Sequence, residues 1–337
     1  MSSVSWSTKS FSPPNSIGTF TLMARKTFRP LDFSKARTYP VKKRLSKVQF
    51  SLLGKKVQRG ARVRSFLEGL PDILAAQNLK AVARKIAQVH RAKKTILLGM
   101  GAHPVKVGLS PLIIDFMEKG IVNAVALNGA AVIHDFELAY MGETSEDVAA
   151  SLKDGSFGMA EETGAFLNQA INEGSKKELG IGAAVGRAIL QGKLPHRRLS
   201  IVATGTRLGI PVTSHIAIGT DIIHMHPQAD GRALGDGSLR DFRTLTSVVA
   251  TLQGGVYLNL GSAVVLPEVF LKALSLARNL GHPVQRLTTV NLDFLVQYRP
   301  LTNVVHRPTL ESGKGYHLTG HMEIMVPLLF AAVLEQL

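Results

Sequence analysis

Residues 95–140 read TILLGMGAHPVKVGLSPLIIDFMEKGIVNAVALNGAAVIHDFELAY, and this stretch decides the fold class. The apolar run 96–98 ends at glycines, which is typical of a buried parallel strand that stops at a ligand-facing turn. Apolar residues then recur at helical spacing, and Gly120 stands where the C-cap of that helix would be. The next apolar run, 122–127, ends in Asn-Gly-Ala-Ala at 128–131. Two such strand ends side by side predict a ligand crevice at the carboxyl edge of an open α/β sheet.

The rest of the chain continues the alternation of apolar runs and helical patterns. We predict helices within residues 65–92, 157–190, 242–252, 267–280 and 325–334. We predict strands at 200–203, 211–218, 256–260 and 284–295, a loop with one helical turn at 143–154 and a Gly- and Asp-rich loop at 224–238. This order predicts an α/β fold of the Rossmann-like kind, with a doubly wound, mostly parallel sheet and helices on both faces.

Composition limits the class of protein. The chain has 337 residues, 45% of them hydrophobic, which suffices for one large α/β domain with appendages. It contains no run of about 18 apolar residues, so we expect no membrane span. It has no cysteine, which excludes disulfides, cysteine nucleophiles and thiolate metal sites and suits a cytoplasmic location.

The net charge of +16 is concentrated in the N-terminal part. Residues 1–94 hold 21 Lys and Arg against 3 Asp and Glu, whereas the remainder holds 19 against 21. We therefore predict three parts: residues 1–22, a Ser-rich disordered tail or a start assigned too early; residues 23–64, a basic arm; and residues 65–337, a single α/β domain. The arm has two open interpretations, a contact with nucleic acid or a solvated or oligomer-packing segment.

Three segments resemble a known family. Residues 128–135, NGAAVIHD, stand where deoxyhypusine synthases have T-A-G-G-x-E-E-D. Residues 233–241, ALGDGSLRD, are similar to the family's A-L-T-D-G-S-L-G-D, and residues 260–265, LGSAVV, to its L-G-G-G-V-V. Over about residues 66–337 the chain therefore resembles a divergent deoxyhypusine synthase.

The resemblance implies a cofactor and an assembly. It implies a deoxyhypusine synthase-like NAD-binding fold and a homotetramer whose sites lie at subunit interfaces. The implied NAD contacts come from the strand-end turns and from the second motif: Gly99, Gly101, His103, Asn128, Gly129, Ala130, Asp135, Asp236, Gly237, Ser238, Gly261 and Ser262.

The resemblance also implies a transferase that oxidises a polyamine-like amine with NAD and forms an imine on a lysine. Lys314, which follows Ser312 and Gly313, is the candidate for that lysine, although the family has W-G-K there. His134 replaces the glutamate with which the family binds its polyamine, and we expect it to act as an acid or base. Asp241 is the implied anchor for the amine.

Histidines and carboxylates crowd the region around residues 215–230. His224 and His226 are two residues apart, a spacing that metal sites also use, but spacing fixes no third ligand. We therefore expect these two histidines to line a substrate pocket without a metal. Glu268 follows the position at which the family has a substrate-binding histidine, and it is a further candidate contact for a cation.

Taken together, the residues and the resemblance predict an NAD-dependent, deoxyhypusine synthase-like transferase. Its small-amine substrate need not be spermidine, because His134 replaces a carboxylate. Two alternatives stay open. One is a non-catalytic nucleotide-binding protein that contacts nucleic acid through its basic arm. The other is a metal-assisted amidine or amide hydrolase built on the histidine cluster.

Overall fold

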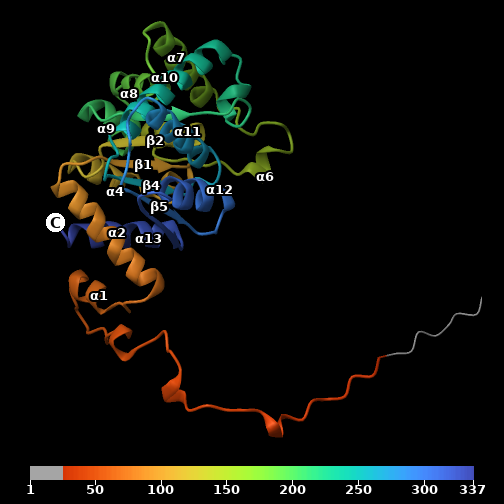
Figure 1. Cartoon of the computed structure of the whole chain (residues 1–337). Helices are drawn as coiled ribbons and strands as arrows, with labels where there is room; N and C mark the ends of the chain where they lie inside the picture. Colours follow the sequence, from red (N-terminus) through yellow and green to blue (C-terminus); the bar gives the residue numbers. More distant parts are fainter. Residues whose placement is uncertain (1–25) are drawn as a thin grey trace, which may run out of the picture. The chain divides into compact units, whose positions relative to one another are not determined.

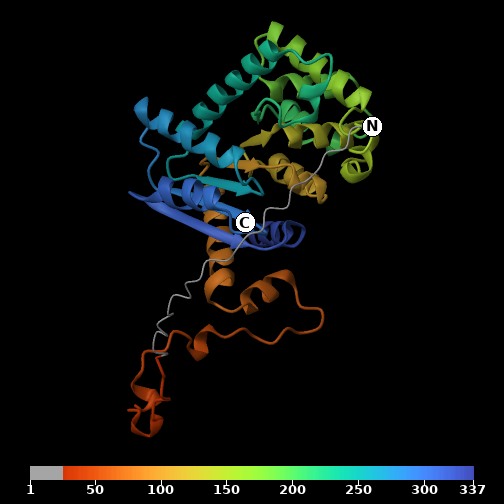
Figure 2. The same cartoon turned by 90° about the vertical axis from the view of Figure 1, so that its right-hand side faces the viewer.

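The computed structural model of the chain describes residues 26–337 (Figure 1 and Figure 2). The predicted tail, residues 1–22, lies outside the described residues. The chain divides into two units, Met1–Val48 and Gln49–Leu337. Every described residue of the first unit is exposed, and two single turns are its only described helices, η1 (Phe33–Lys35) and η2 (Val41–Lys43). The second unit begins with η3 (Phe50–Leu52) and takes in the last part of the predicted arm together with the α/β domain.

Six strands form one all-parallel sheet in the order β3-β2-β1-β4-β5-β6. Their bounds are β1 (Ile96–Met100), β2 (Ala124–Asn128), β3 (Val212–His215), β4 (Val256–Leu260), β5 (Leu287–Asp293) and β6 (Gly313–Thr319). The chain starts at the middle of the sheet, moves to one edge, and then returns to the other side of β1, so the winding reverses between β1 and β4. This is the doubly wound order of Rossmann-type folds, and it confirms the predicted fold class.

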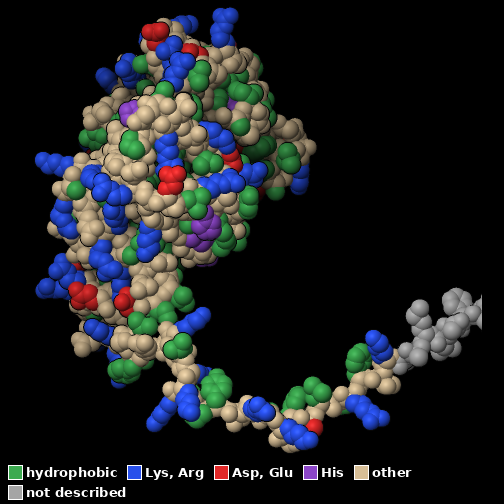
Figure 3. Space-filling model, viewed as in Figure 1, with side chains coloured by type: hydrophobic (Ala, Val, Ile, Leu, Met, Phe, Trp, Pro, Cys, Tyr) green, Lys and Arg blue, Asp and Glu red, His purple; other side chains and the backbone are tan. Residues whose placement is uncertain are grey.

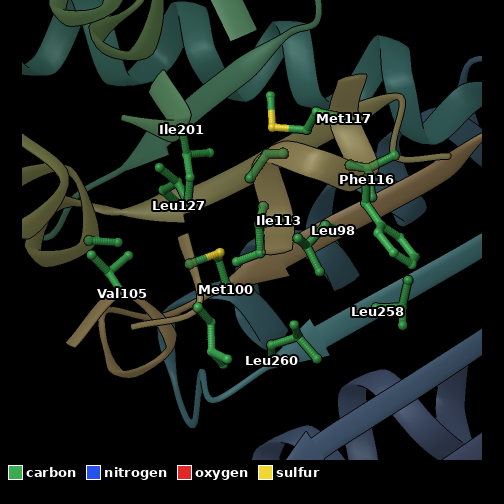
Figure 4. Close-up of a cluster of buried hydrophobic side chains, with 14 of the residues drawn as sticks. Leu98, Met100, Val105, Ile113, Phe116, Met117, Leu127, Ile201, Leu258 and Leu260 are labelled. Carbon is green, nitrogen blue, oxygen red and sulfur yellow. The ribbon is translucent and has the colours of Figure 1, made fainter. Parts of the chain in front are cut away.

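Alternating side chains along the strands divide the core into two clusters. Leu98 and Met100 face the first cluster, and Leu97 faces the second. Both faces of the central strands are therefore buried, which explains their continuous apolar runs. Figure 4 shows part of the first cluster, where Phe116 lies near Leu98 and Leu258. Helices that contribute to the first cluster include α2 (Leu74–Arg91), α4 (Ser110–Glu118), α9 (Ile201–Leu208) and α13 (Met322–Leu334), and those of the second are α10 (Gly231–Ala250) and α11 (Val265–Asn279).

The remaining helices connect these elements. In Figure 1, α7, α8 and α10 lie toward the β3 edge of the sheet, and α2 and α13 lie toward the opposite edge. None of the helices in residues 26–337 has the length and the apolar run that crossing a bilayer requires. The bounds not yet given are α1 (Val63–Gly69), α3 (His103–Lys106), α5 (Gly129–Met141), α6 (Val148–Ser151), α7 (Glu161–Lys176), α8 (Ile181–Gln191), η4 (Arg197–Leu199), η5 (Ile222–Met225), α12 (Tyr298–Pro300), η6 (Leu301–His306) and η7 (Arg307–Thr309).

The predicted strand at residues 200–203 is wrong, because these residues begin α9. The carboxylate of Asp135 accepts the backbone N–H groups of Ile201 and Val202 at 2.7 and 3.3 Å, and Ser200 is the N-cap. A buried acceptor for the first N–H groups stabilises a helix start that the apolar sequence alone does not reveal.

Two further predictions failed around α10 and β6. The Gly- and Asp-rich loop predicted at 224–238 is largely helical, because Asp230 accepts the N–H of Arg232 at 2.8 Å and starts α10 at Gly231. Strand β6 was not predicted, since glycines at 313 and 315 weaken the strand pattern. The loop predicted at 143–154 is confirmed, with α6 as its helical turn.

Candidate functional site

A pocket of about 200 Å³ lies among the segments that follow β1, β2 and β3 at the carboxyl edge of the sheet. We name it the acidic pocket, because its ionisable lining residues are Glu137, Glu146 and Asp221 with His134 and Lys106. Its volume is below the roughly 300–1,000 Å³ of pockets for drug-sized ligands, so it fits a small molecule. Three carboxylates against one lysine favour a cationic ligand.

His134 belongs to a hydrogen-bonded chain that fixes its tautomer. Thr144 Oγ1 donates to Oε2 of Glu137 at 2.5 Å, so it accepts from Nδ1 of His134 at 2.6 Å and the lone pair of the imidazole is on Nε2. Thr163 donates to the other oxygen of Glu137 at 3.2 Å. Burial raises the pKa of Glu137, but the hydrogen bonds and the charge of His134 outweigh it and lower this pKa below its ordinary value. Glu137 is therefore an ionised partner that orients a neutral or protonated imidazole.

The side chain of Asp221 packs against the first residues of α5. Its carboxylate leaves no room for a Cβ at Gly129, and it accepts a backbone hydrogen bond from Ala130. The Asn128 side chain accepts the N–H of Ala131 at 3.0 Å. Two of the first N–H groups of this helix are thus paired within the protein, so its N-terminus is not an open phosphate site. Of the predicted NAD contacts in this turn, Gly129 and Ala130 lie against the Asp221 carboxylate, and Asn128 caps the helix.

The side chains of Asp221 and His224 lie close to each other. Nδ1 of His224 accepts the N–H groups of Gly219 and Asp221 at 3.1 and 3.4 Å, so its hydrogen is on Nε2. Nε2 lies 3.8 Å from Asp221 Oδ2, and neither atom has a hydrogen-bond partner within residues 26–337 although the two side chains are only 4% and 5% exposed. Burial lowers the pKa of His224 and raises that of Asp221 to about 6. Since buried polar atoms are nearly always paired, these two atoms are exceptions in the described part of the chain, and Asp221 is the one of the two residues that lines the acidic pocket.

We expect the binding of a small cation in the acidic pocket to strengthen as the pH rises through about 6. Asp221 loses its proton in that range, and only its ionised form attracts an ammonium group. Binding of 1,4-diaminobutane, measured by titration calorimetry, should be about tenfold weaker at pH 5 than at pH 7.5. Asp221→Asn should lose this pH dependence, and an unchanged profile in that variant would contradict the assignment.

The winding of the sheet reverses where β1 and β4 end side by side. Gly101 N–H donates to the carbonyl of Leu260 at 3.1 Å, and a Cβ at Gly101 would lie 2.5 Å from the carbonyl oxygen of Gly261. Gly99 lies inside β1, where a Cβ would lie 2.5 Å from the hydroxyl of Tyr257. Gly99 therefore packs closely against Tyr257 inside the sheet, and its predicted contact with a cofactor stays a prediction.

A polar ladder supports the turn after β4. Asn259 donates to the carbonyl of Ser262 at 2.9 Å and to the side chain of Asn291 at 2.7 Å, and Asn291 contacts Nδ1 of His317 at 3.1 Å. The three ladder residues are register neighbours on β4, β5 and β6. This buried row holds the Ser262 turn in place at the switch point, where open α/β sheets bind their ligands.

Aromatic rings gather at the same edge of the sheet. The ring centroids of His103 and Phe294 are 5.6 Å apart, those of Phe294 and His321 are 6.4 Å apart, and Phe294 is 45% exposed. An exposed ring system beside the small residues Gly261 and Ser262 fits the flat bases of a dinucleotide. Of the predicted NAD contacts, Gly101, His103, Gly261 and Ser262 lie at this switch point.

Two predicted aspartates hold helices in place. Asp135 is buried beneath α9, and burial raises its pKa to about 6 while Ser200 and the N–H groups of Ile201 and Val202 lower it. Asp241 accepts the N–H groups of Gly182 and Ser214 at 2.9 and 2.8 Å, and burial raises its pKa to about 7. In this structure both carboxylates accept hydrogen bonds from backbone donors, and their predicted roles as cofactor contact and amine anchor stay predictions.

The predicted NAD contacts Asp236, Gly237 and Ser238 lie in the middle of α10, away from the switch point. Asp236 is paired with Arg240 at 3.0 Å and accepts from Ser175 at 2.9 Å. A Cβ at Gly237 would lie 2.9 Å from the side chain of Ile181. Residues 233–241 are therefore similar in sequence to the family's motif, but they lie inside a helix and do not form a ligand-binding turn.

The other predicted substrate contacts are also engaged elsewhere. His226 Nε2 donates to the carbonyl of Gly158 at 2.8 Å and fixes the loop before α7. Glu268 accepts from Asn303 at 2.8 Å and lies 3.5 Å from Arg299. Within residues 26–337, no three His, Asp or Glu side chains are grouped as metal ligands would be.

Lys314 lies at the opposite end of the sheet from the acidic pocket. It pairs with Thr288 near the start of β6, and its Nζ is 5.0 Å from the ring centroid of Tyr316. All strands are parallel, and β6 has seven residues, so roughly 20 Å of strand separates its two ends. The structure does not bring Lys314 together with His134 in one chain.

Sequence reasoning missed Asp221, Glu137 and Lys106 as pocket residues. The sequence does place Asp221 among the crowded histidines, and it follows the predicted strand 211–218, which was the available signal. Glu137 lies one helical turn after His134, but helical spacing alone does not distinguish a pocket partner from a solvated carboxylate.

Comparisons with known proteins show a similarity in fold. No protein-family model matches the chain, and no curated protein matches it. One similar solved structure is that of unliganded AgrE, which is 14% identical to this chain with a TM-score of 0.50. The match covers 79% of this chain and 34% of the AgrE chain. The arginine dihydrolase ArgZ from the cyanobacterial ornithine-ammonia cycle is 15% identical with a TM-score of 0.49, covering 78% and 33%. This chain thus spans about a third of the length of these two proteins.

A third solved structure is that of a candidate deoxyhypusine synthase from Entamoeba histolytica. It is 11% identical with a TM-score of 0.48, and the match covers 84% of this chain and 96% of the other. At such identities a likeness to a solved structure concerns the fold alone.

Proposed function

We propose that the protein is an NAD-dependent enzyme that oxidises a small amine held in the acidic pocket. The observation that carries this proposal is Asp221, a largely buried residue of the acidic pocket whose Oδ2 atom lacks a partner within residues 26–337. A buried carboxylate with one oxygen atom left without a partner, at the carboxyl edge of a parallel sheet, is suited to an ammonium group. Glu137 and Glu146 add negative charge to the same pocket.

Each pocket residue has a role in this proposal. Asp221 binds the ammonium form of the amine and places its carbon toward the switch point. His134 Nε2, with its lone pair fixed by Thr144 and Glu137, removes the proton from the amine nitrogen. When bound, NAD would supply the hydride acceptor, so loss of one proton and one hydride would convert the substrate ammonium into an iminium ion.

The switch point is the proposed place for NAD. Gly261 and Ser262 lack bulk, the turn is held by Asn259, and the rings of His103 and Phe294 lie at the neighbouring strand ends. The strand order is the one found in dinucleotide-binding folds. Transfer of the alkyl group through a lysine is not part of this proposal, because Lys314 lies at the other end of the sheet.

Lys106 narrows the substrate class. It is the single lysine of the acidic pocket, and it lies across from three carboxylates contributed by other segments. A substrate with a carboxylate in addition to its amine would pair with both sets of charges. Amino acids with a second amine are therefore the first compounds to test, followed by simple diamines.

We expect NADH absorbance to increase when NAD and such an amine are mixed with the protein. The panel should contain diamino acids, monoamino acids and diamines of the same chain length. His134→Gln should lower the rate by about 10²–10⁴ and keep NAD binding, because a positioned base contributes that much. No NADH from any amine, together with no amine binding in calorimetry, would refute the proposal. The homotetramer and the cytoplasmic location stay predictions.

A further inference from the structure

The basic arm carries unpaired charge. Residues 26–62 contain 12 Lys and Arg and a single acidic residue, Asp32. None of these cations makes an ion pair within the described part of the chain, residues 26–337. Such a segment repels itself and needs an anionic partner to become compact.

Exposed aromatic rings alternate with these cations. Phe28, Phe33, Tyr39 and Phe50 are 89%, 79%, 66% and 91% exposed. Figure 3 shows Lys and Arg side chains spaced along the described arm with hydrophobic side chains between them. The segment thus carries both groups that bind single-stranded nucleic acid: cations bind the phosphates, and flat aromatic rings stack on unpaired bases.

A basic groove of about 390 Å³ lies in the larger unit, at the amino edge of the sheet. Its cationic lining residues come from three elements: Arg84 and Lys85 from α2, Arg286 from the turn before β5, and Lys314 from β6. No acidic residue lines the groove, and Gln88 and Thr288 complete its polar wall. Four like charges around one groove destabilise each other unless an anion lies among them.

We propose that the protein binds single-stranded nucleic acid through residues 26–62 of the basic arm and through the basic groove. Residues 95–337 carry 19 basic and 21 acidic side chains, so a second copy of the domain offers little net negative charge to match the arm. Phosphodiesters match both the arm and the groove, and unpaired bases match the exposed rings. This function uses Lys314, which has no part in the acidic pocket, and it is independent of the amine chemistry.

The test is fluorescence anisotropy of the full chain with labelled 20-nucleotide oligo(U) and oligo(dT) between 50 and 300 mM NaCl. Each phosphate neutralised on a single strand contributes roughly 0.7 to the slope of log affinity against log salt. Replacing Lys42, Lys43 and Arg44 with Gln should therefore reduce the slope by about 2. The fourfold Gln variant of the groove cations should reduce it by about 3.

A second variant separates stacking from charge. Replacing the four exposed aromatic residues with Leu should weaken binding about tenfold or more at fixed salt while the slope stays the same, because stacking does not release counterions. The matched control replaces the exposed Lys153, Lys177 and Lys193 with Gln and should bind like the wild type. Three results would overturn the proposal: no binding at 50 mM salt, equal losses in the control, or binding to anionic lipid vesicles without binding to either oligonucleotide.

Discussion

Replacing Asp221 with Asn should weaken amine binding and turnover by about two orders of magnitude or more. The reason is that a buried ammonium would lose its carboxylate partner, and loss of one member of a buried charge pair costs about 2–5 kcal/mol. The fold should persist, because the Asn side-chain oxygen can still accept the hydrogen bond from Ala130 at the start of α5. The measurements are kcat/KM with the amine that gives NADH and its Kd by calorimetry.

The control for this prediction is Asp230→Asn. Asp230 caps α10 through the N–H groups of Arg232 and Ala233, and Asn caps helices about as well as Asp. This variant also removes one negative charge from the same loop region, so it should retain wild-type turnover. Equal turnover in the wild type and in Asp221→Asn would remove the acidic pocket from the proposed reaction.

Replacing Asp241 with Ala should lower the free energy of unfolding by about 3 kcal/mol or more. The N–H groups of Gly182 and Ser214 would both lose their buried acceptor, and each unsatisfied buried donor costs about 1–3 kcal/mol. The same carboxylate links α10 to the beginning of α8 and to β3, so three elements lose a common contact. Urea denaturation at pH 7, followed by circular dichroism, measures the change.

Asp236→Ala is the matched comparison, since Asp236 lies five residues earlier on the same helix. It is partly exposed and paired with Arg240, so its removal should change the free energy of unfolding by about 1 kcal/mol or less. The family resemblance gives both aspartates a ligand, whereas the structure makes one of them a buried tie and the other a surface partner. Similar losses of stability in the two variants would contradict this distinction.

The fold was predictable because its signals are local. The strands at 96–100 and 124–128 are apolar on both faces, and glycine or Asn-Gly marks their ends. A parallel sheet needs that pattern, so the alternation of strands and helices indicated the doubly wound class. The failures had distant causes: α9 begins where it does because Asp135, about 65 residues earlier, accepts its first N–H groups.

The candidate site was only half predictable. His134 and the Asn-Gly turn follow a recognisable strand, and His134 lines the pocket together with Ala130, the residue after that turn. Asp221 reaches the same point from beyond β3, after some 90 residues of intervening helices, and no sequence spacing encodes that approach. The motif at 233–241 lies in a helix interior because Asp230 caps the helix just before it, and similarity to a motif does not reveal that cap.

The sequence by itself determined that residues 95–140 form two buried strands with small residues at their ends, and that the positive charge belongs to the N-terminal arm. Hydrophobic periodicity and charge counting are properties of neighbouring residues, so they can be read along the chain. Only the tertiary structure decided which buried side chains accept hydrogen bonds from backbone N–H groups, as Asp135 and Asp241 do. It also decided which buried atoms have no partner in the described part of the chain, as with Asp221 Oδ2 and His224 Nε2. Whether a buried carboxylate is a helix cap or a ligand depends on the donors that folding brings within about 3 Å of it.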